Sequence, residues 1–283
     1  MRRASRRSIH NAKRLAKRAA TTALGFVGLI PVKRARRERV ISLVESLRPR
    51  VPETWPEETF LTRYGPPSDG GYLIPDDVEG IRALFSPGIG ALTGFDEDVA
   101  KRGIRVHAAD GSIDPHQLPS DPGFTSFVRK HVSALDSSTT MTLDTWVQAH
   151  EPRVEDDLML QMDIEGDEFV TLLACSPQTL QRFRILVVEV HWLHNLWIPA
   201  FLDIAEVTFQ RLEASHQCVH AHANNYERVS VTAGLAMPDV LELTYWRRDR
   251  LGDAPLVAAT QLPHPLDAPN APSRPDVALP SVW

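Results

Sequence analysis

The feature that most constrains the fold is an alternation of short apolar runs with amphipathic or turn-rich stretches across residues 51–250. Several of the runs are apolar throughout, as buried parallel strands are. Because helical stretches separate most of the first five runs, we expect an α/β fold with a mostly parallel seven-stranded sheet and helices on both faces. The last two runs are close in sequence, which predicts an antiparallel pair at one edge. The predicted strands are 83–86, 105–109, 128–133, 158–162, 185–190, 217–223 and 240–245.

The two ends of the chain differ from this central region in composition. Residues 1–50 are predicted to be a basic arm, since residues 1–40 hold 13 of the 31 Lys and Arg residues and one acid, Glu38. The remaining residues hold 18 basic and 35 acidic side chains, a formal charge of −17. We therefore expect a body that repels nucleic acid and an arm that binds an anionic surface. Residues 251–283 contain seven prolines and no periodicity, which predicts an extended or disordered tail.

The arm also bears on localisation. Apolar residues recur at helical spacing from Ile9 to Ile30, which is typical of a basic helix lying on a membrane surface. A mobile solvated tail explains the same residues equally well. Val40, Val44 and Leu47 predict a second helix. The longest uncharged N-terminal stretch, 19–32, is shorter than the roughly 20 apolar residues that span a membrane. With only two cysteines in the chain, we expect a cytoplasmic protein, which the basic arm can bring to the inner face of the membrane.

The first candidate site residues are Gly88 and Gly90, in a turn directly after the strand 83–86. Glycines there let a cofactor approach the backbone, but Thr93 stands where a dinucleotide-binding fingerprint has its third glycine. The strand 105–109 ends at Asp110, about 20 residues beyond the glycines. In Rossmann-like folds an acid at that position bonds to ribose hydroxyls. The sequence therefore predicts a nucleotide-containing cofactor without a typical pyrophosphate turn.

The second candidate is a group of carboxylates after the buried strand 158–162. Asp163, Glu165, Asp167 and Glu168 follow that strand within six residues. Ligands bind at the carboxyl ends of parallel strands in open sheets, so Asp163 and Glu165 are predicted to face a site. Asp167 and Glu168 suit the first turn of the following helix equally well.

Five segments together resemble the FkbM-type methyltransferases: 162–168 (MDIEGDE), 186–191 (LVVEVH), 142–146 (TLDTW), 69–75 (DGGYLIP) and 220–226 (HAHANNY). The resemblance covers roughly residues 60–248 and departs from the family at the glycine turn. It implies the Rossmann-like class I methyltransferase fold, S-adenosyl-L-methionine as cofactor, and O-methylation of a sugar or glycolipid hydroxyl.

This implied function assigns roles to the candidate residues. Gly88, Gly90, Asp110, Ser133 and Asp163 are predicted to bind the cofactor, with Ser133 on the adenine side. Transfer to a hydroxyl also needs a base.

For that base we favour His222 over Asp163 and Glu165, because imidazole titrates nearest to neutral pH. A metal held by Asp163, Glu189 and a histidine has no recognised ligand spacing, so we predict none. Two other functions stay open: an oxidoreductase with a degenerate Rossmann turn, and an inactive membrane-tethered interaction module.

Overall fold

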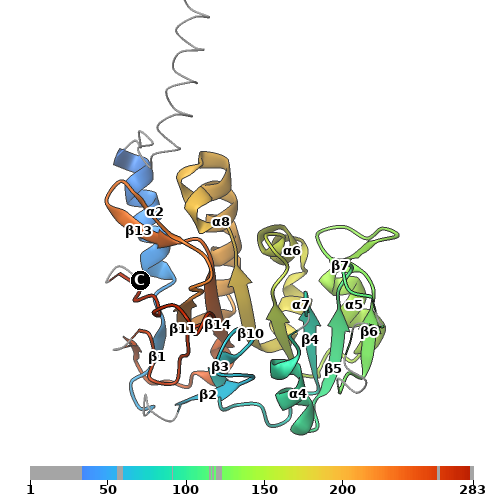
Figure 1. Cartoon of the computed structure of the whole chain (residues 1–283). Helices are drawn as coiled ribbons and strands as arrows, with labels where there is room; N and C mark the ends of the chain where they lie inside the picture. The colour runs from blue at the N-terminus through green and yellow to red at the C-terminus, as the bar shows by residue number, and fades with distance from the viewer. Residues whose placement is uncertain are drawn as a thin grey trace, which may run out of the picture.

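The computed structural model describes residues 34–55, 60–90, 92–114, 116, 118, 123–259 and 262–280. Its centre is a seven-stranded sheet with the strand order β11-β14-β10-β9-β4-β5-β6 (Figure 1). Neighbouring strands from β10 to β6 are parallel, whereas β14 is antiparallel to both β10 and β11. The protein therefore has an α/β fold with a mostly parallel sheet. The strands are β4 (Ala83–Pro87), β5 (Arg105–Ala109), β6 (Ser126–Val128), β9 (Leu158–Met162), β10 (Phe183–Val190), β11 (His216–Ala223) and β14 (Leu241–Arg247).

Six of the seven predicted strands correspond to strands of this sheet, with ends that agree within two residues. Every residue of β9 and β10 is buried, which explains why their sequences are almost continuously apolar. The predicted antiparallel pair at one edge is confirmed, since β11 pairs with β14. The strand predicted at 128–133 is wrong in its extent. The backbone N–H of Lys130 donates to the carbonyl of Val128 (2.9 Å) and turns the chain, so β6 ends there and His131–Val132 form the separate strand β7.

Helices cover the two faces of the sheet unequally. Side chains of β9 alternate between two hydrophobic cores, with Leu158, Leu160 and Met162 in one and Met159 in the other. The first core is closed by α5 (Leu143–His150), α6 (Glu168–Ala174), α7 (Pro177–Arg182) and α8 (Pro199–Glu213). Among the described residues, the second is closed by α4 (Gly94–Lys101) together with short strands.

These short strands form small antiparallel or parallel pairs outside the main sheet. The pairs are β1 (Arg50–Pro52) with β15 (Leu256–Ala258), β2 (Leu61–Tyr64) with β3 (Tyr72–Pro75), β7 with β8 (Thr140–Met141), and β12 (Val229–Thr232) with β13 (Leu235–Pro238). Two 3₁₀ turns, η2 (Leu193–Trp197) and η3 (Arg248–Arg250), follow β10 and β14. The loop between β2 and β3 reaches the carboxyl ends of the parallel strands, because its residues Asp69 and Gly70 line a cavity there.

The helix predicted around Val40 is present as α2 (Arg34–Ser46). Val40, Val44 and Leu47 are buried in the first core, and Arg39 forms an ion pair with Asp203 of α8 (2.7 Å). Figure 1 shows α2 beside α8. This part of the predicted basic arm therefore belongs to the folded body. The surface helix predicted over residues 9–30 lies outside the described residues.

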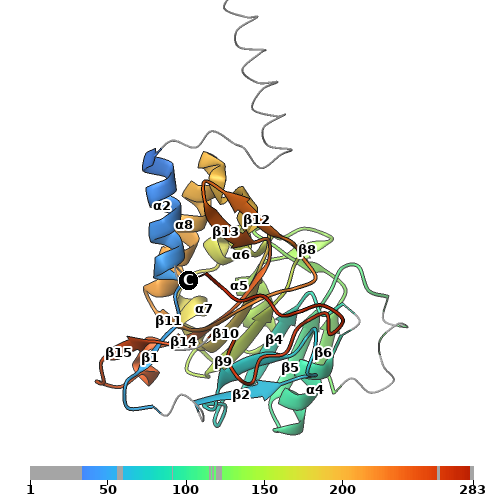
Figure 2. The same cartoon turned by 60° about the vertical axis from the view of Figure 1, so that its left-hand side comes forward.

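The proline-rich C-terminal segment has defined contacts with the sheet, although it has little regular structure. Asn270 donates from Nδ2 to Asp69 (3.1 Å) and to Glu242 on β14 (2.6 Å). Val277 forms an isolated β-bridge with Ala223, the last residue of β11. The segment can be followed in red in Figure 2. The described residues 262–280 therefore have little regular structure, as the absence of periodicity led us to expect, and they pack against the sheet.

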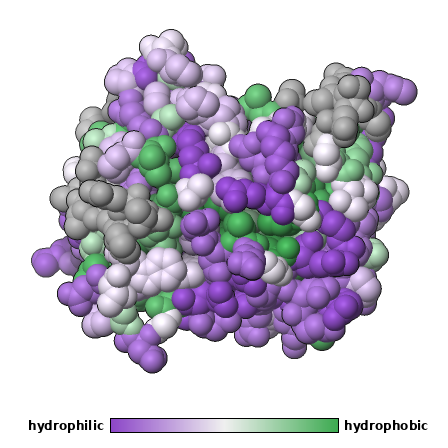
Figure 3. Space-filling model, turned by 90° about the horizontal axis from the view of Figure 1, so that it is seen from below, coloured by the Kyte–Doolittle hydropathy of each residue, from purple (hydrophilic) through white to green (hydrophobic). Residues whose placement is uncertain are grey.

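The surface seen from below is mostly hydrophilic, and hydrophobic side chains are visible mainly in a central hollow (Figure 3). Within the described residues, none of the helices has the length and apolar character needed to cross a membrane.

Candidate active site

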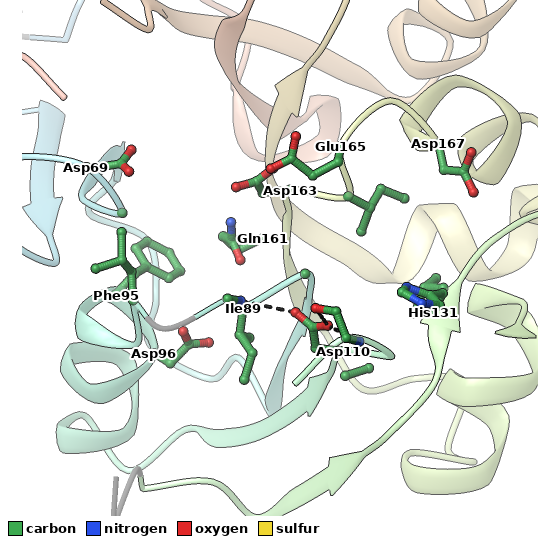
Figure 4. Close-up of a pocket in the computed structure, with 18 of the residues that line it drawn as sticks. Asp69, Ile89, Phe95, Asp96, Asp110, His131, Gln161, Asp163, Glu165 and Asp167 are labelled. Atoms are coloured by element: carbon green, nitrogen blue, oxygen red, sulfur yellow. Dashed lines mark hydrogen bonds between the residues drawn. The ribbon is translucent and has the colours of Figure 1, made fainter. Parts of the chain in front are cut away.

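A cavity of about 440 Å³ lies at the carboxyl ends of β4, β5 and β9. This is the edge at which open parallel sheets bind their ligands, and the volume lies in the usual range for small-molecule pockets. The loop between β2 and β3 and the start of α4 close its remaining sides (Figure 4). The lining residues are Asp69, Gly70, Tyr72, Gly88, Ile89, Gly90, Leu92, Phe95, Asp96, Ala109, Asp110, Ser112, His131, Val132, Gln161, Asp163, Ile164, Glu165 and Asp167.

Both predicted glycines line this cavity, but for different reasons. Gly88 has a φ of +80°, and a Cβ there would lie 1.5 Å from the backbone oxygen of Asp163. Gly88 is therefore required for β4 and β9 to end side by side. Gly90 has a φ of +51°, and a Cβ there would meet no atom within 4 Å. Its lack of a side chain keeps this part of the cavity open.

Asp110 lies at the end of β5, as predicted, and faces the cavity. Its Oδ1 accepts hydrogen bonds from the backbone N–H (2.7 Å) and the hydroxyl (2.6 Å) of Ser112, and its Oδ2 accepts one from the N–H of Gly90 (3.2 Å). Burial acts to raise the pKa of Asp110, but these hydrogen bonds outweigh it and hold the pKa below its usual value. The cavity therefore contains an ionised acceptor fixed in place by the glycine turn.

Asp163 and Glu165 follow β9 and lie next to each other at the opposite part of the cavity from Asp110 (Figure 4). Burial raises the pKa of Asp163 to about 7; His191 opposes this effect, and Glu165 adds to it. Glu165 adopts a φ of 56°, which is unusual for a residue other than glycine, and its side chain is 86% exposed. This backbone turn directs its carboxylate back toward Asp163.

His191, directly after β10, completes this group. Its Nε2 lies 3.7 Å from Asp163 Oδ1 and 3.5 Å from Glu165 Oε2, while its Nδ1 lies 3.0 Å from Glu168 Oε1. Burial acts to lower the pKa of His191, but Glu168 and the other two carboxylates raise it above its usual value. We predicted no metal site, yet one ligand atom from each of Asp163, Glu165 and His191 lies within 4.8 Å of the others. The sequence spacing did not reveal this group because Glu165 and His191 belong to different strand ends.

A second cavity of about 800 Å³ adjoins the first. The two share Asp69, Asp163 and Glu165, so these carboxylates stand at their junction. Trp192 and Tyr226 are about half exposed here, at 48% and 50%. The second cavity is lined by Asp69, Asp163, Glu165, Glu189, His191, Trp192, His194, Asn224, Tyr226, Glu227, Arg228, Asp239 and Val240.

His222, the favoured base, does not line either cavity. It is 4% exposed, and its Nδ1 and Nε2 lie 3.0 Å from carboxylate oxygens of Glu242 and Asp276. Burial opposes protonation, but the two carboxylates raise the pKa of His222 to about 10. At neutral pH His222 is therefore a cation that joins β11 to the C-terminal segment. Its position outside the lining of both cavities, with both ring nitrogens engaged by carboxylates, favours this structural role over the predicted role as the base.

Ser133 also lies outside the lining of the cavities. Its hydroxyl donates to Asp167 (3.2 Å), and its backbone N–H donates to Met141 (2.9 Å). The neighbouring strand β7 instead places His131 and Val132 in the first cavity. The early end of β6 explains this difference, because it shifts which residues of 128–133 reach the sheet edge.

Gln161 and Asp69 are among the polar lining residues that the sequence reasoning missed. Gln161 is a polar residue within the buried strand β9, and its Oε1 accepts a hydrogen bond from Ser86 (2.9 Å). A polar side chain inside an apolar run is a sequence signal that could have identified Gln161. Asp69 lies in the 69–75 segment, but nothing local indicates that its carboxylate reaches the junction of the cavities.

Comparison with protein-family models gives no match to this chain, and comparison with curated proteins gives none either.

Proposed function

We propose that the protein is an S-adenosylmethionine-dependent O-methyltransferase that acts on a hydroxyl of a sugar or glycolipid. The observation that carries this proposal is the charge of the first cavity. Its described lining contains six carboxylates, those of Asp69, Asp96, Asp110, Asp163, Glu165 and Asp167, and no Lys or Arg. Such a lining suits a ligand with positive sulfonium and ammonium groups. It would repel the pyrophosphate of a dinucleotide, which argues against the oxidoreductase alternative.

The fold and the position of Asp110 support the same proposal. The mostly parallel sheet with an antiparallel edge pair is the arrangement that the resemblance to class I methyltransferases implies. Asp110 ends the strand next to the glycine turn, where an acid can accept hydrogen bonds from ribose hydroxyls. Ile89, Ala109 and Val132 provide apolar surface for an adenine ring in the same part of the cavity. Asp69 and Asp163, farther along, can hold the ammonium group.

The acceptor is proposed to occupy the second cavity. Trp192 and Tyr226 offer aromatic faces on which a sugar ring can pack, while Glu189 and Asn224 offer hydrogen-bonding groups. The shared carboxylates place this cavity in direct continuity with the first, so a hydroxyl at the junction can reach the methyl group. Holding the reacting atoms in this way can contribute several kcal/mol.

S-adenosylmethionine supplies an activated methyl group, whose bond to sulfur breaks as its bond to the acceptor oxygen forms. The chain must orient the hydroxyl and accept its proton. Asp69, Asp163 and Glu165 line both cavities. Of these we assign the proton to Asp163 or Glu165, which lie next to each other at the junction of the cavities (Figure 4). A positioned base contributes about 10²–10⁴-fold to the rate.

The proposal is tested by titrating the protein with S-adenosylmethionine and, separately, with NAD⁺ in a calorimeter. We expect only S-adenosylmethionine to bind, and Asp110→Asn to weaken it about 5- to 150-fold, equivalent to about 1–3 kcal/mol for lost hydrogen bonds to a charged acceptor. Asp253→Asn is the matched control, because Asp253 is exposed and does not line the cavity. Binding of NAD⁺ alone would contradict the proposal.

Turnover is then measured with glycan and glycolipid acceptors. Methylation of a hydroxyl would support the full proposal. Binding of S-adenosylmethionine without transfer to any of these acceptors would favour the inactive interaction module. A cytoplasmic location, with the basic arm at the inner face of the membrane, would place such an enzyme beside glycolipid acceptors.

A further inference from the structure

We propose that Asp163, Glu165 and His191 bind one divalent metal cation at the junction of the two cavities. The site would use two carboxylate oxygens and one imidazole nitrogen, a ligand set that suits divalent ions such as Mn²⁺. The cation's role in the reaction rests on the proposed function, whereas its binding does not.

The first argument is the orientation of His191. Glu168 is fully buried, and its Oε1 accepts hydrogen bonds from the backbone N–H groups of Ile164 (3.2 Å) and Gly166 (3.0 Å). The same oxygen lies 3.0 Å from Nδ1 of His191, so Nδ1 carries a proton. A carboxylate that fixes one ring nitrogen in this way is the usual partner of a metal-binding histidine. The other nitrogen, Nε2, then points toward Asp163 and Glu165.

The second argument is that Nε2 has no hydrogen bond to any described residue. The side chain of His191 is 9% exposed, and the atoms nearest to Nε2 are carboxylate oxygens at 3.5 and 3.7 Å. These distances are too long for hydrogen bonds. Two ligand atoms that each lie about 2.1 Å from a metal are about 3.0–3.4 Å apart. The two distances from Nε2 therefore need to shorten by only a few tenths of an ångström around a cation. All three ligand atoms lie within 4.8 Å of one another, and rotation of the exposed Glu165 side chain can bring its carboxylate closer.

The third argument is that, among the described residues, the carboxylates at the junction have no positive partner other than His191. Asp163 Oδ1 is buried without a hydrogen bond, and Asp69 faces the same space. The only Lys or Arg that lines either cavity, among the described residues, is Arg228, which is mostly exposed and paired with Asp239 (2.9 Å). Buried carboxylates are normally paired or coordinate a metal. A divalent cation would supply the missing charge.

The position also suits a chemical role. A cation held by these three residues faces the second cavity, where the acceptor hydroxyl is proposed to lie. A hydroxyl bound to a metal loses its proton more readily. With the cation bound, Asp163 and Glu165 would therefore act as its ligands instead of as the base, and the proton would pass to solvent. The exposed side of the site, where Glu165 lies, leaves room for such a ligand.

The test is a titration of the chelator-treated full chain with Mn²⁺ alone, followed by electron paramagnetic resonance. We expect one bound Mn²⁺ per chain. Glu165→Gln should weaken binding at least tenfold, and because Glu165 is exposed this change should leave the fold intact. Glu227→Gln, which removes another exposed acid of the second cavity, should bind Mn²⁺ like the wild type.

A second measurement identifies the nitrogen ligand. Electron spin echo modulation of bound Mn²⁺ should show coupling to an imidazole nitrogen, and His191→Gln should remove it. The proposal is overturned if Mn²⁺ does not bind, if Glu165→Gln and Glu227→Gln weaken it equally, or if no nitrogen coupling is seen. Binding of S-adenosylmethionine is measured in parallel. If Mn²⁺ binds and S-adenosylmethionine does not, the metal site stands and the proposed function fails; the reverse result removes the metal site alone.

Discussion

His222 is expected to stabilise the fold as a buried cation, and this makes stability depend on pH in a defined direction. Its pKa rises from the usual 6.5 to about 10 because Glu242 and Asp276 contact both ring nitrogens. A group whose pKa is raised on folding contributes its full stabilisation below the unfolded pKa. That stabilisation is then lost as the pH rises through the folded value. The free energy of unfolding should therefore fall between about pH 6.5 and pH 10.

The size of this effect follows from the same values. At 1.36 kcal/mol per pH unit, the interval between 6.5 and about 10 corresponds to about 5 kcal/mol. The side chain of Asp276 is 24% exposed, so solvent screens part of this interaction. We therefore expect a net contribution of about 2–4 kcal/mol, which is a large part of the stability of a typical domain.

Urea unfolding of the wild type and of His222→Gln, measured from pH 6 to pH 10, isolates this contribution. The difference in unfolding free energy between the two proteins should be largest at low pH and should shrink as the pH rises. Asp276→Asn is a milder variant that keeps the imidazole, and it should move the loss of stability to lower pH. A difference that does not change with pH would refute the reasoning. If instead His222→Gln unfolds like the wild type but loses turnover, His222 acts in catalysis after all.

Two further predictions concern the glycine turn and the arm. Gly88→Ala should destabilise the protein by about 2–5 kcal/mol in thermal unfolding, because its Cβ would overlap the backbone of Asp163. Gly90→Ala has only the cost of the left-handed backbone conformation and should destabilise the protein by about 1–2 kcal/mol. Equal losses of stability would contradict the close approach at Gly88. The full chain should sediment with anionic vesicles at low salt and be released from them at high salt. A protein without residues 1–33 retains α2, so it should stay folded but should not sediment with the vesicles. Vesicle binding that survives this deletion would place the binding surface on the folded body.

The sheet could be predicted from the sequence because its strands carry the signal themselves. A strand such as β9, buried at every residue, must be apolar throughout. Asp110 and Asp163 could be placed at a site for a related reason: a carboxylate directly after such a strand can only lie at the sheet edge where ligands bind. The end of β6 could not be predicted, because a turn at Lys130 decides it.

Contacts between distant residues account for the errors at the site. His222 appeared to be a candidate base because nothing near it in the sequence shows that Asp276, 54 residues later, occupies its Nε2. The partnership of His191 with Glu168 is hidden in the same way, since it joins the end of β10 to the start of α6. The chemical type of a side chain can be read from the sequence, whereas its protonation depends on partners that only the fold brings together.

The contact between Asn270 and Asp69 has a consequence for the order of assembly. The two residues are 201 positions apart, and Asp69 lines both cavities. During synthesis, all seven strands of the main sheet leave the ribosome before Asn270, which is the residue that hydrogen-bonds to the carboxylate of Asp69. Contacts between such distant positions form late, and a segment with few backbone hydrogen bonds to the sheet opens first in local unfolding. Amide hydrogen exchange should therefore be faster in residues 262–280 than in β9, and the cavity wall at Asp69 should loosen whenever that segment detaches.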